Sequence, residues 1–375
     1  MLNMSDIHLH IVSFDVPYPA NYGGVIDVFY KAKALAEHGV KVHLHCFEYR
    51  RKKAPELEKL FYKVHYYHRD ISKKHLFKTK PYIIETRRSE TLVNNLLQDD
   101  YPILMEGLHT TALLSERKLR NRKRLVRTHN IEHEYYAHLS RVETDLFKKY
   151  YFFNEAAKLK KYEGILSKAD GILTISQTDD AYFSERFERV VYLPAFHPYS
   201  AVKSRTGKGN YVLYHGNLSV PENRNAAATL MRDVFRSTPV PFKIAGLNPP
   251  VSLQRLAEGM PHVELIANPS DAQLQALIAG AQVNIFFTEQ ATGLKLKLLN
   301  ALYNGRFVLT NDKMLSGSKL HEVCVLAGSM AEMKNQLRRL MAKDFTPALK
   351  IQRQLHLQSI YTNGHNVDRL LELIV

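Results

Sequence analysis

The sequence predicts an α/β protein built from two domains, each with a parallel sheet, and three observations support this prediction. Short β-branched and apolar runs alternate with helical patterns along the chain, which is typical of parallel sheets with crossover helices. The alternation stops at residues 195–210 (AFHPYSAVKSRTGKGN), where Pro, Ser, Gly and Lys replace any periodicity. The length of 375 residues is sufficient for two domains of ordinary size.

The first domain is expected to span residues 1–194. A helix beginning near a GlyGly pair should end at Gly39, which suits the left-handed position after a helix. Residues 143–168 are expected to form one long helix. The expected strands lie at 7–13, 41–47, 63–67, 103–105, 124–128, 171–175 and 190–193.

The second domain is expected to span residues 211–355, after a linker at 195–210. A C-terminal helix within 356–375 could return to the first domain. The expected strands lie at 211–214, 242–245, 262–265, 283–287, 307–310 and 323–326, with helices at 223–235, 270–278 and 292–305 among the segments between them.

The composition is that of a soluble globular protein. Hydrophobic residues make up 45% and charged residues 24% of the chain. No apolar run reaches the roughly 20 residues of a transmembrane helix, and the N-terminus lacks the pattern of a signal peptide. Cys46 and Cys324 lie in separate apolar segments, as expected of reduced thiols. We therefore expect a cytoplasmic protein.

A strong positive charge is the first indication of function. The net charge is +15, and residues 51–150 hold 22 Lys or Arg against 13 Asp or Glu, a surplus of 9. Such a surface could bind nucleic acid, anionic lipid or phosphorylated substrates. It could also be a solvated basic face without a partner.

Loops that follow strands are the expected place for a ligand, because open α/β sheets bind ligands at the carboxyl ends of their strands. The loop after the first strand contains Tyr22, Gly23 and Gly24, where the glycines let a phosphate or sugar hydroxyl approach the backbone. A GlyGly pair is also an ordinary turn. The dinucleotide fingerprint GxGxxG is absent here, which argues against an NAD enzyme.

Two further loops of the first domain carry candidate catalytic and substrate-binding side chains. His109 follows a strand and could donate a hydrogen bond to a substrate or leaving group, although it could equally be a surface histidine. Another strand is followed by a polar cluster that we interpret as substrate contacts, with a helix N-cap at Asn130 as the structural alternative. The cluster consists of Arg127, His129, Asn130 and Glu132.

A metal site is not expected. His129 and His133 have the HxxxH spacing, which could suit zinc on a helix. However, the chain offers no convincing further ligands, and the HExxH motif is absent.

In the second domain, the loop after the first strand contains Gly216, which allows close approach of a ligand. Pro221 opens a helix there, and Arg224 lies where it could reach an anion.

The segment TGLKLKLLNALYNG (292–305) is interpreted as a buried helix with Lys295 and Lys297 in its first turns. The positive end of the helix dipole disfavours lysine there, unless an anion binds the lysine together with the free backbone amides. Lys297 shares a polar stripe with Asn300, so we predict an anion site at Lys297. The alternative is that both lysines extend to solvent.

Three segments of the second domain share a pattern with a known family: YHGNLSVPENRNAA (214–227), HVELIANPSDAQLQALIAGAQVNIFF (262–287) and TGLKLKLLNALYNGRFVLT (292–310). They resemble the donor domain of group 1 glycosyltransferases of the GT-B fold, in the family-4-like branch. The first domain resembles the acceptor domain of that family through NYGGVIDVFYKAKALAEHGVKVHLHCF (21–47) and RTHNIEHEYY (127–136). The resemblance implies two Rossmann-like domains with parallel sheets facing a cleft.

The resemblance also implies an activity, namely hexosyl transfer from a UDP- or GDP-linked sugar, with retention and without a metal or other cofactor. Lys297 would hold the diphosphate beside the Gly293 backbone, and His109 matches the family's active-site histidine. Gly24 would lie near the donor phosphates or the acceptor.

The sequence departs from the family pattern at two places. Thr292 and Asn300 stand where the family has two glutamates, although Asn300 can still donate and accept hydrogen bonds to a donor nucleotide. Asn217 replaces a family arginine, and Arg224 is the cation nearby.

The expected acceptor is a glycan or a lipid-diphosphate-linked glycan in bacterial surface polysaccharide or lipopolysaccharide synthesis. The basic first domain would make peripheral contact with anionic lipid at the cytoplasmic face of a membrane, and no nucleic acid is expected.

Two alternatives stay open. A GT-B-type nucleotide-sugar epimerase would need carboxylate acid/base groups, for which Glu106 or Glu132 could serve. A non-enzymatic nucleic-acid-binding protein would fit the sequence pI of about 9.5, but no basic–aromatic recognition motif is found.

Overall fold

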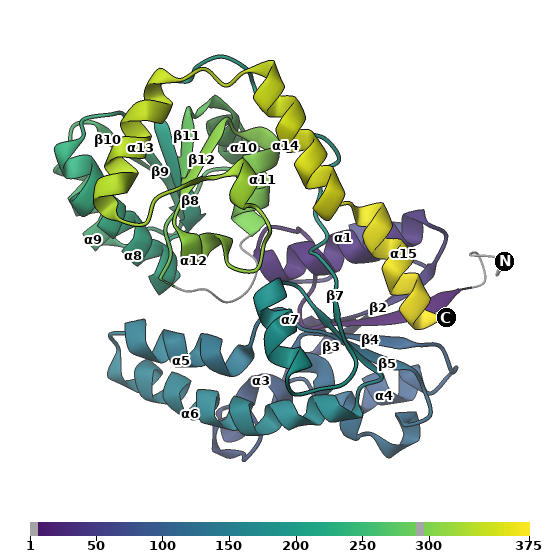
Figure 1. The fold of residues 1–375 in the computed structure, drawn as a ribbon. Helices are drawn as coiled ribbons and strands as arrows, with labels where there is room; N and C mark the ends of the chain where they lie inside the picture. Colours follow the sequence, from purple (N-terminus) through teal and green to yellow (C-terminus); the bar gives the residue numbers. More distant parts are fainter. Residues whose placement is uncertain (1–6, 290–295) are drawn as a thin grey trace. The chain divides into compact units, whose positions relative to one another are not determined.

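The computed structural model describes residues 7–289 and 296–375, and the chain divides into two compact units. One unit comprises Met1–Pro198 together with Tyr361–Val375, and the other comprises Tyr199–Ile360 (Figure 1). Each unit is built around a parallel sheet, so the expected two-domain α/β architecture is confirmed.

The first unit contains a seven-stranded sheet in the order β3-β2-β1-β4-β5-β6-β7, with all neighbours parallel. The strand order reverses between β1 and β4, which is where open α/β sheets bind ligands. The strands are β1 (His8–Ser13), β2 (Lys41–Glu48), β3 (Lys63–His68), β4 (Ile103–Glu106), β5 (Arg124–Arg127), β6 (Gly171–Thr174) and β7 (Val190–Tyr192).

Helices cover both faces of this sheet. The helices are α1 (Gly23–Glu37), α2 (Pro55–Leu60), α3 (Tyr82–Glu85), α4 (Glu90–Leu96), α5 (Glu132–Val142), α6 (Leu146–Tyr162), α7 (Gln177–Ser184) and α15 (Asn363–Ile374). The 3₁₀ segments η2 (Lys73–Phe77), η3 (Leu108–Ser115), η4 (Arg117–Leu119) and η5 (Glu163–Lys168) lie between them.

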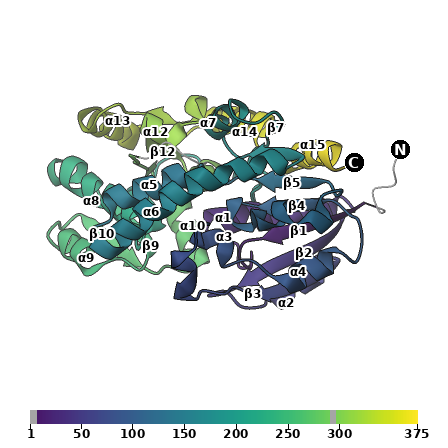
Figure 2. The ribbon, with the colours of Figure 1, turned by 90° about the horizontal axis from the view of Figure 1, so that it is seen from below.

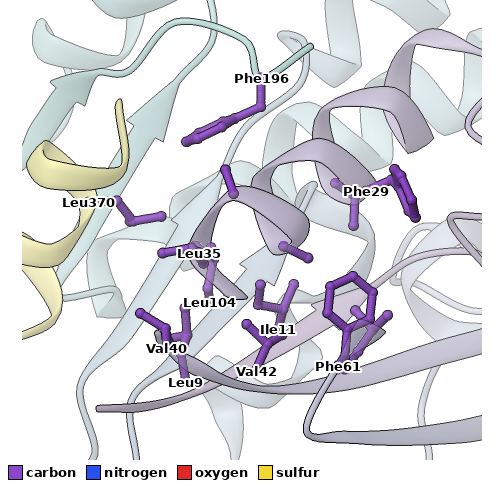
Figure 3. Packing of buried hydrophobic residues seen from close by; sticks show 14 of the residues in the cluster. Leu9, Ile11, Phe29, Leu35, Val40, Val42, Phe61, Leu104, Phe196 and Leu370 are labelled. Atoms are coloured by element: carbon purple, nitrogen blue, oxygen red, sulfur yellow. The ribbon is translucent and has the colours of Figure 1, made fainter. Parts of the chain in front are cut away.

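The period-two pattern of the strands produces a separate core on each face of the sheet. Leu104 of β4 packs into the core beneath α1, α2 and α15, whereas its neighbours Ile103 and Met105 pack into the core beneath α3, α4, η3 and α6. Figure 3 shows the first of these cores, where Leu35 and Leu370 approach the strand residues from α1 and α15.

The second unit contains a six-stranded parallel sheet in the order β10-β9-β8-β11-β12-β13. Its strands are β8 (Val212–Asn217), β9 (Phe242–Leu247), β10 (Val263–Ala267), β11 (Val283–Ile285), β12 (Phe307–Thr310) and β13 (Val325–Leu326). Its helices are α8 (Pro221–Thr229), α9 (Val251–Glu258), α10 (Asp271–Gly280), α11 (Leu296–Asn304), α12 (Asp312–Leu315), α13 (Met330–Ala342) and α14 (Pro347–Ile360).

The segment expected to form one long helix at 143–168 is α6 followed by the 3₁₀ segment η5. Asp145 begins α6 as its N-cap, where the carboxylate accepts a hydrogen bond from the backbone of Lys148. The preceding helix α5 lies beside α6, and the two form a helical pair that both views show (Figures 1 and 2).

The segment 195–210, expected to be a linker, is divided between the two units. Phe196 is fully buried in the first unit. Ser204, in contrast, donates a hydrogen bond to the Gly305 carbonyl of the second unit, at 2.5 Å. The helix α15 belongs to the first unit, where it contacts α1 and Asn366 donates to the Pro194 carbonyl at 3.2 Å.

A row of histidines crosses β1, β2 and β3 in the first unit. His10 Nδ1 lies 2.8 Å from His45 Nε2, and His45 stacks on His65 with ring centroids 5.0 Å apart. Burial lowers the pKa of His10 to about 4 and that of His45 well below its usual value. The row is therefore an array of neutral, hydrogen-bonded rings at neutral pH.

Among residues 7–289 and 296–375, no helix combines the length and the apolar character needed to cross a bilayer.

Candidate active site

The first unit gathers polar side chains at the carboxyl ends of β1, β4 and β5, as the sequence predicted for loops after strands. Glu106 is the last residue of β4, and His109 lies three residues beyond it in η3. Arg127 is the last residue of β5, and His129 follows it. Helix α1, which follows β1, contributes further charged groups from its buried face.

Four of these charged side chains form a fully buried network, which we call the ion network: Asp27, Lys31, Glu106 and Arg127. Lys31 Nζ donates to Asp27 Oδ2 at 2.9 Å and lies 2.8 Å from Glu106 Oε1. Arg127 donates to both oxygens of Asp27, from Nε to Oδ2 at 3.0 Å and from Nη2 to Oδ1 at 2.9 Å. Burial would raise the pKa of Asp27, but the attraction of Arg127 and Lys31 holds it well below its usual value.

The burial of Arg127 corrects our expectation that it contacts substrate. Its guanidinium is fully buried, and it also donates to the carbonyl of Thr174 at 3.0 Å and that of Pro194 at 3.2 Å. Because the guanidinium binds Asp27 of α1 and the carbonyl of Thr174, it connects α1 to the carboxyl ends of β5 and β6. Arg127 is therefore a structural residue of the first unit.

Glu106 likewise has no exposed surface, and it is paired with Lys31. His129 Nε2 lies 2.9 Å from Glu106 Oε2, so His129 extends the ion network. His133 contacts the hydroxyl of Tyr182 instead, with Nε2 at 2.8 Å. The two histidines of the HxxxH spacing therefore have different partners.

Asp27, Glu106 and His129 bring potential metal-ligand atoms within 4.8 Å of one another. The same carboxylates already bind the ammonium of Lys31 and the guanidinium of Arg127, which supply two positive charges. A cluster that is neutralised by its own cations fits an internal ion network better than a cation site.

His109 is a partly accessible titratable group at this edge of the sheet. Its side chain is 19% exposed, and Phe14 packs against its ring with centroids 5.0 Å apart. Burial, followed by repulsion from Arg87 and Arg69, lowers the pKa of His109 well below its usual value. His109 is thus a neutral imidazole at physiological pH, able to donate one hydrogen bond and accept another.

Glu132 begins α5 and lies beside His109, with Oε1 4.0 Å from His109 Nδ1. Its side chain is 5% exposed, and burial raises its pKa to about 8. A hydrogen bond from Asn130 favours the charged form, but its effect on the pKa is smaller than that of burial. The carboxyl group is therefore mostly protonated at pH 7. The N-cap of α5 is Ile131, and the Asn130 side chain forms a hydrogen bond with Glu132. The structural alternative, in which Asn130 is the N-cap, is therefore not found.

The loop between β1 and α1 contacts this region through Phe14, which packs against the His109 ring. Tyr22 is 41% exposed, and its hydroxyl donates to Asp15 Oδ2 at 2.8 Å. Gly24 lies against Phe14 so closely that a Cβ would come within 2.7 Å of the Phe14 ring. The first turn of α1 carries no acidic side chain and no side-chain cap, which leaves its amides suited to an anion.

Three arginines in this region escaped the sequence analysis: Arg51, Arg69 and Arg87. Arg51 Nε donates to the Val16 carbonyl at 2.7 Å, and Arg87 Nε donates to the Phe14 carbonyl at 2.8 Å. Arg51 and Arg87 reach the β1–α1 loop from distant segments, whereas the described hydrogen bond of Arg69 is to Thr86 Oγ1 at 3.1 Å. Only the general excess of cations in residues 51–150 indicated them.

In the second unit, Lys297 lies at the carboxyl end of β8. Its Nζ donates to Asn223 Oδ1 at 2.9 Å and lies 5.3 Å from the ring centroid of Tyr214 and 5.6 Å from that of Phe286. It occupies the first turn of α11 as the structure describes that helix. Burial, together with the charge of Lys297, lowers the pKa of nearby His215 to about 3. The ammonium is therefore held among aromatic rings and an amide instead of extending freely into solvent.

Gly216 and Asn223 shape the backbone beside this lysine. A Cβ on Gly216 would come within 3.1 Å of the Asn223 side chain, which itself donates to the Asn217 carbonyl at 3.0 Å. Asn223 lies in the segment 214–227 but is not among the predicted site residues. It joins β8, α8 and α11 at one point.

The remaining candidates of the second unit are placed as follows. Asn300 is half-buried on α11, and its Oδ1 accepts a hydrogen bond from Asn304 at 2.9 Å, so the two share one face of the helix. Arg224 is half-buried on α8. Thr292, Gly293 and Lys295 lie outside the described residues.

Comparison with solved structures identifies the fold. The structures similar to the whole chain are glycosyltransferases of the GT-B fold, so the chain has the GT-B fold. Sucrose-phosphate synthase from Thermosynechococcus elongatus matches with a TM-score of 0.70 and 16% identity, over 98% of each chain. TarM matches with a TM-score of 0.70 and 10% identity, over 98% of this chain and 99% of TarM. HepE from Anabaena, solved with UDP-glucose, matches with a TM-score of 0.64 and 11% identity over 98% and 99%.

Among curated proteins, the chain is similar to one from Klebsiella pneumoniae named "Uncharacterized 44.6 kDa protein in cps region". The two are 28% identical over 320 residues, which cover 80% of this chain and 82% of that protein. No family model matches the chain.

Proposed function

We propose that the protein is a glycosyltransferase that moves a hexosyl unit from a UDP- or GDP-linked donor to a glycan or lipid-linked glycan. The observation that carries the proposal is the position of Lys297, whose Nζ is fixed at 2.9 Å from Asn223 Oδ1 at the end of β8. The GT-B fold and the solved complex of HepE with UDP-glucose support it. The relative from a cps region supports a role in surface polysaccharide or lipopolysaccharide synthesis in the cytoplasm.

The proposed chemistry depends on charge that develops on the leaving group. When the bond between the anomeric carbon and the diphosphate breaks, negative charge accumulates on the diphosphate oxygens. A preorganised ammonium at Lys297 stabilises that charge and lowers the barrier. On this basis we propose that transfer needs no metal ion, and from the family resemblance we propose that it retains the anomeric configuration.

In the first unit, the proposal assigns His109 and Glu132 to the reacting sugars. Glu132 Oε1 lies 4.0 Å from His109 Nδ1, beyond hydrogen-bond distance, and the neutral imidazole carries one N–H. That N–H can donate to a sugar hydroxyl or the leaving oxygen. The exposed hydroxyl of Tyr22 and the amides of Gly24 are further polar contacts for the sugars.

A nucleotide-sugar epimerase is the second candidate, because the pKa of Glu132, raised to about 8, suits a general acid. Glu106 does not suit that role, since it is fully buried and paired with Lys31. The two candidates differ in their products. An epimerase gives an epimeric sugar with no net release of nucleoside diphosphate, whereas a transferase releases nucleoside diphosphate when an acceptor is present.

The decisive experiment is a thermal-shift screen with UDP-, GDP- and dTDP-linked sugars, since a specific ligand stabilises the fold by mass action. We expect one UDP- or GDP-linked sugar to raise the melting temperature. Lys297→Ala should weaken its binding by roughly 10- to 100-fold, the effect of losing a charge-assisted contact. Lys208→Ala is the matched control, because Lys208 belongs to the same unit, is 53% exposed and pairs only loosely with Asp344 at 3.6 Å. Equal binding by wild type and Lys297→Ala would refute the assignment.

We also propose peripheral contact with anionic lipid through α6, which presents an apolar stripe to solvent. Leu146, Tyr150 and Phe153 are 79%, 69% and 64% exposed, and at about 100° per residue they share one face with Ala157. Phe147 beside them is 90% exposed. Lys149, Lys160 and Lys161 flank the stripe within about 70°, a combination that suits the headgroup region of an anionic bilayer.

Sedimentation with vesicles tests this contact. Wild type should bind vesicles of phosphatidylcholine with phosphatidylserine and release them at high salt, whereas Phe147→Ser with Phe153→Ser should not bind. Ile351→Ser is the matched control, since Ile351 of α14 is also exposed, at 62%. If the double substitution left vesicle binding intact but dissociated a dimer, the stripe would be a contact with a second copy.

A further inference from the structure

Arg51, in the loop between β2 and α2, is bonded through each nitrogen of its guanidinium to the loop between β1 and α1. Its Nε donates to the Val16 carbonyl at 2.7 Å, and its Nη1 donates to Asn21 Oδ1 at 2.9 Å. Its Nη2 donates to the Pro19 carbonyl. Because the guanidinium is a rigid planar fork, these contacts fix three positions of the β1–α1 loop relative to one another.

The β1–α1 loop depends on such side chains, because residues 14–21 form neither helix nor strand. Within the part of the chain that the structure describes, no hydrogen bond joins the backbone of these residues to another backbone group. Pro17 and Pro19 have no N–H to donate. A segment of this kind keeps one conformation only where contacts from outside hold it, and Arg51 supplies three of these contacts.

Tyr22 ends this loop and is held at two places. Its hydroxyl donates to Asp15 Oδ2 at 2.8 Å, and the guanidinium carbon of Arg51 lies over its ring, 5.5 Å from the ring centroid. A cation at this distance is attracted by the π electrons of the ring. The residue is nevertheless 41% exposed. Tyr22 is therefore an exposed aromatic side chain whose orientation is fixed before any ligand binds.

The contacts of Gly24 show that Tyr22 belongs to the candidate active site. A Cβ on Gly24 would lie 3.6 Å from Tyr22 Cε2 and 2.7 Å from Phe14 Cζ, so the Gly24 backbone adjoins both rings. Phe14 in turn packs against His109, with ring centroids 5.0 Å apart. A continuous set of contacts therefore leads from the exposed tyrosine to the candidate catalytic histidine.

We propose that Tyr22 is an aromatic platform on which a sugar ring of the substrate packs, and that Arg51 is the positioning residue that holds it. A pyranose ring has apolar C–H faces as well as hydroxyl groups, and a tyrosine offers a rigid apolar surface with a polar end. Fixing that surface before binding reduces the entropy that binding costs. That the bound ring is a sugar rests on the proposed function.

The competing explanation is that Arg51 only stabilises the loop and that Tyr22 binds nothing. Replacing a purely structural arginine would lower the melting temperature, but the folded protein would bind sugars with an unchanged dissociation constant. Arg51→Lys separates charge from geometry, because an ammonium keeps the positive charge and loses the planar fork. Its effect on sugar binding should be intermediate between those of wild type and Arg51→Ala.

The test uses Tyr22→Trp, which introduces a single indole because the chain contains no tryptophan. Its fluorescence is titrated with the methyl glycosides of glucose, galactose, N-acetylglucosamine and glucuronic acid, and with glycerol, alone and in the presence of UDP. We expect at least one glycoside, but not glycerol, to shift the emission saturably to shorter wavelength, because a packed sugar ring removes water from the indole. Adding Arg51→Ala should weaken that glycoside by roughly 3- to 10-fold, the effect of losing a preorganised contact.

Arg50→Ala in the Tyr22→Trp protein is the matched control. Arg50 is exposed and lies over a different ring, with its guanidinium carbon 5.4 Å from the centroid of Tyr49. Its replacement should leave the titration unchanged. Saturation-transfer NMR compares wild type with Tyr22→Ala and so checks that the indole itself does not create the site.

Three results would overturn the proposal: no saturable change with any glycoside, equal binding by wild type and Tyr22→Ala, or an unchanged dissociation constant in Arg51→Ala. If a glycoside bound the platform but no nucleotide sugar bound the protein, the platform would stand and the proposed function would fail.

Discussion

His109 Nδ1 and Glu132 Oε1 lie 4.0 Å apart, and burial keeps each group in its neutral form. The imidazole resists protonation, while the carboxyl group resists ionisation up to a pH of about 8. Two groups that would ordinarily form an ion pair are therefore neutral neighbours. At 4.0 Å they form no direct hydrogen bond, but each can bind a sugar hydroxyl without placing a fixed charge beside it.

His109→Asn should lower kcat for sugar transfer by roughly 10²- to 10⁴-fold, the usual contribution of a positioned proton donor. The dissociation constant of the nucleotide should not change, because Lys297 and not His109 is assigned to the diphosphate. Steady-state kinetics and calorimetry measure the two effects. His68→Asn, at an exposed position that ends β3, is the control. A weakened nucleotide with unchanged kcat would contradict the assignment.

Glu132→Gln should stabilise the protein at alkaline pH. The folded pKa of about 8 exceeds the ordinary value of 4.5, so the folded protein binds more protons than the unfolded chain between these pH values. The stability contributed by the protonated carboxyl is complete below pH 4.5 and is lost as the pH rises through 8. At pH 8 the neutral amide should raise the free energy of unfolding by roughly 1–3 kcal/mol.

Urea denaturation at pH 6, 7, 8 and 9 measures this dependence. Glu134→Gln is the matched control, because Glu134 lies on the same helix with an exposed side chain. If Glu132→Gln gave the same pH dependence as Glu134→Gln, the carboxyl group would not be neutral in the folded protein.

Asp27→Asn should destabilise the first unit by about 3–5 kcal/mol, because it leaves Arg127 buried without its carboxylate. Glu37→Gln on the same helix breaks an exposed pair with Lys33, whose Nζ lies 3.7 Å away, and should cost less than about 1 kcal/mol. Denaturant unfolding compares the two variants. A stable Asp27→Asn protein that had lost activity would instead place the ion network in catalysis.

Acid should unfold the first unit through its row of histidines. The folded pKa of His10, about 4, lies below the ordinary 6.5, so the unfolded chain binds more protons between these values. The stability from neutral His10 is present above pH 6.5 and is lost as the pH falls toward 4. Each such histidine adds a slope of about 1.4 kcal/mol per pH unit.

Thermal melts from pH 7 to pH 4.5 should show a smaller acid loss in His10→Asn than in wild type. His68→Asn should keep the wild-type pH dependence, because His68 is exposed at the end of β3. An identical pH dependence in all three proteins would show that the buried row does not titrate with unfolding.

The architecture could be predicted because strand and helix periods are local properties of the sequence. The strands at 103–105 and 124–128 were read from their apolar runs, and both are present as β4 and β5. The rule that ligands meet the carboxyl ends of strands selected the loops of His109 and Glu132, and the structure places the two side chains 4.0 Å apart.

Side-chain direction could not be predicted in the same way. Arg127 ends β5 and Glu132 lies five residues beyond it, yet Arg127 is directed into the buried network and Glu132 lies beside His109. The difference depends on Asp27, which is 100 residues distant in sequence from Arg127. Arg87 was missed for the same reason, since its contact with Phe14 spans 73 residues.

The position of α15 affects the order in which the protein can mature during synthesis. Val367, Leu370 and Ile374 complete a core whose other buried residues, apart from Leu371 of the same helix, lie between Leu9 and Phe196. Most of the first unit therefore leaves the ribosome before α15 can cover its apolar surface. The second unit is continuous in sequence and can fold on its own. We infer that nascent chains expose this surface until α15 emerges, so the first unit should become resistant to proteolysis later than the second unit.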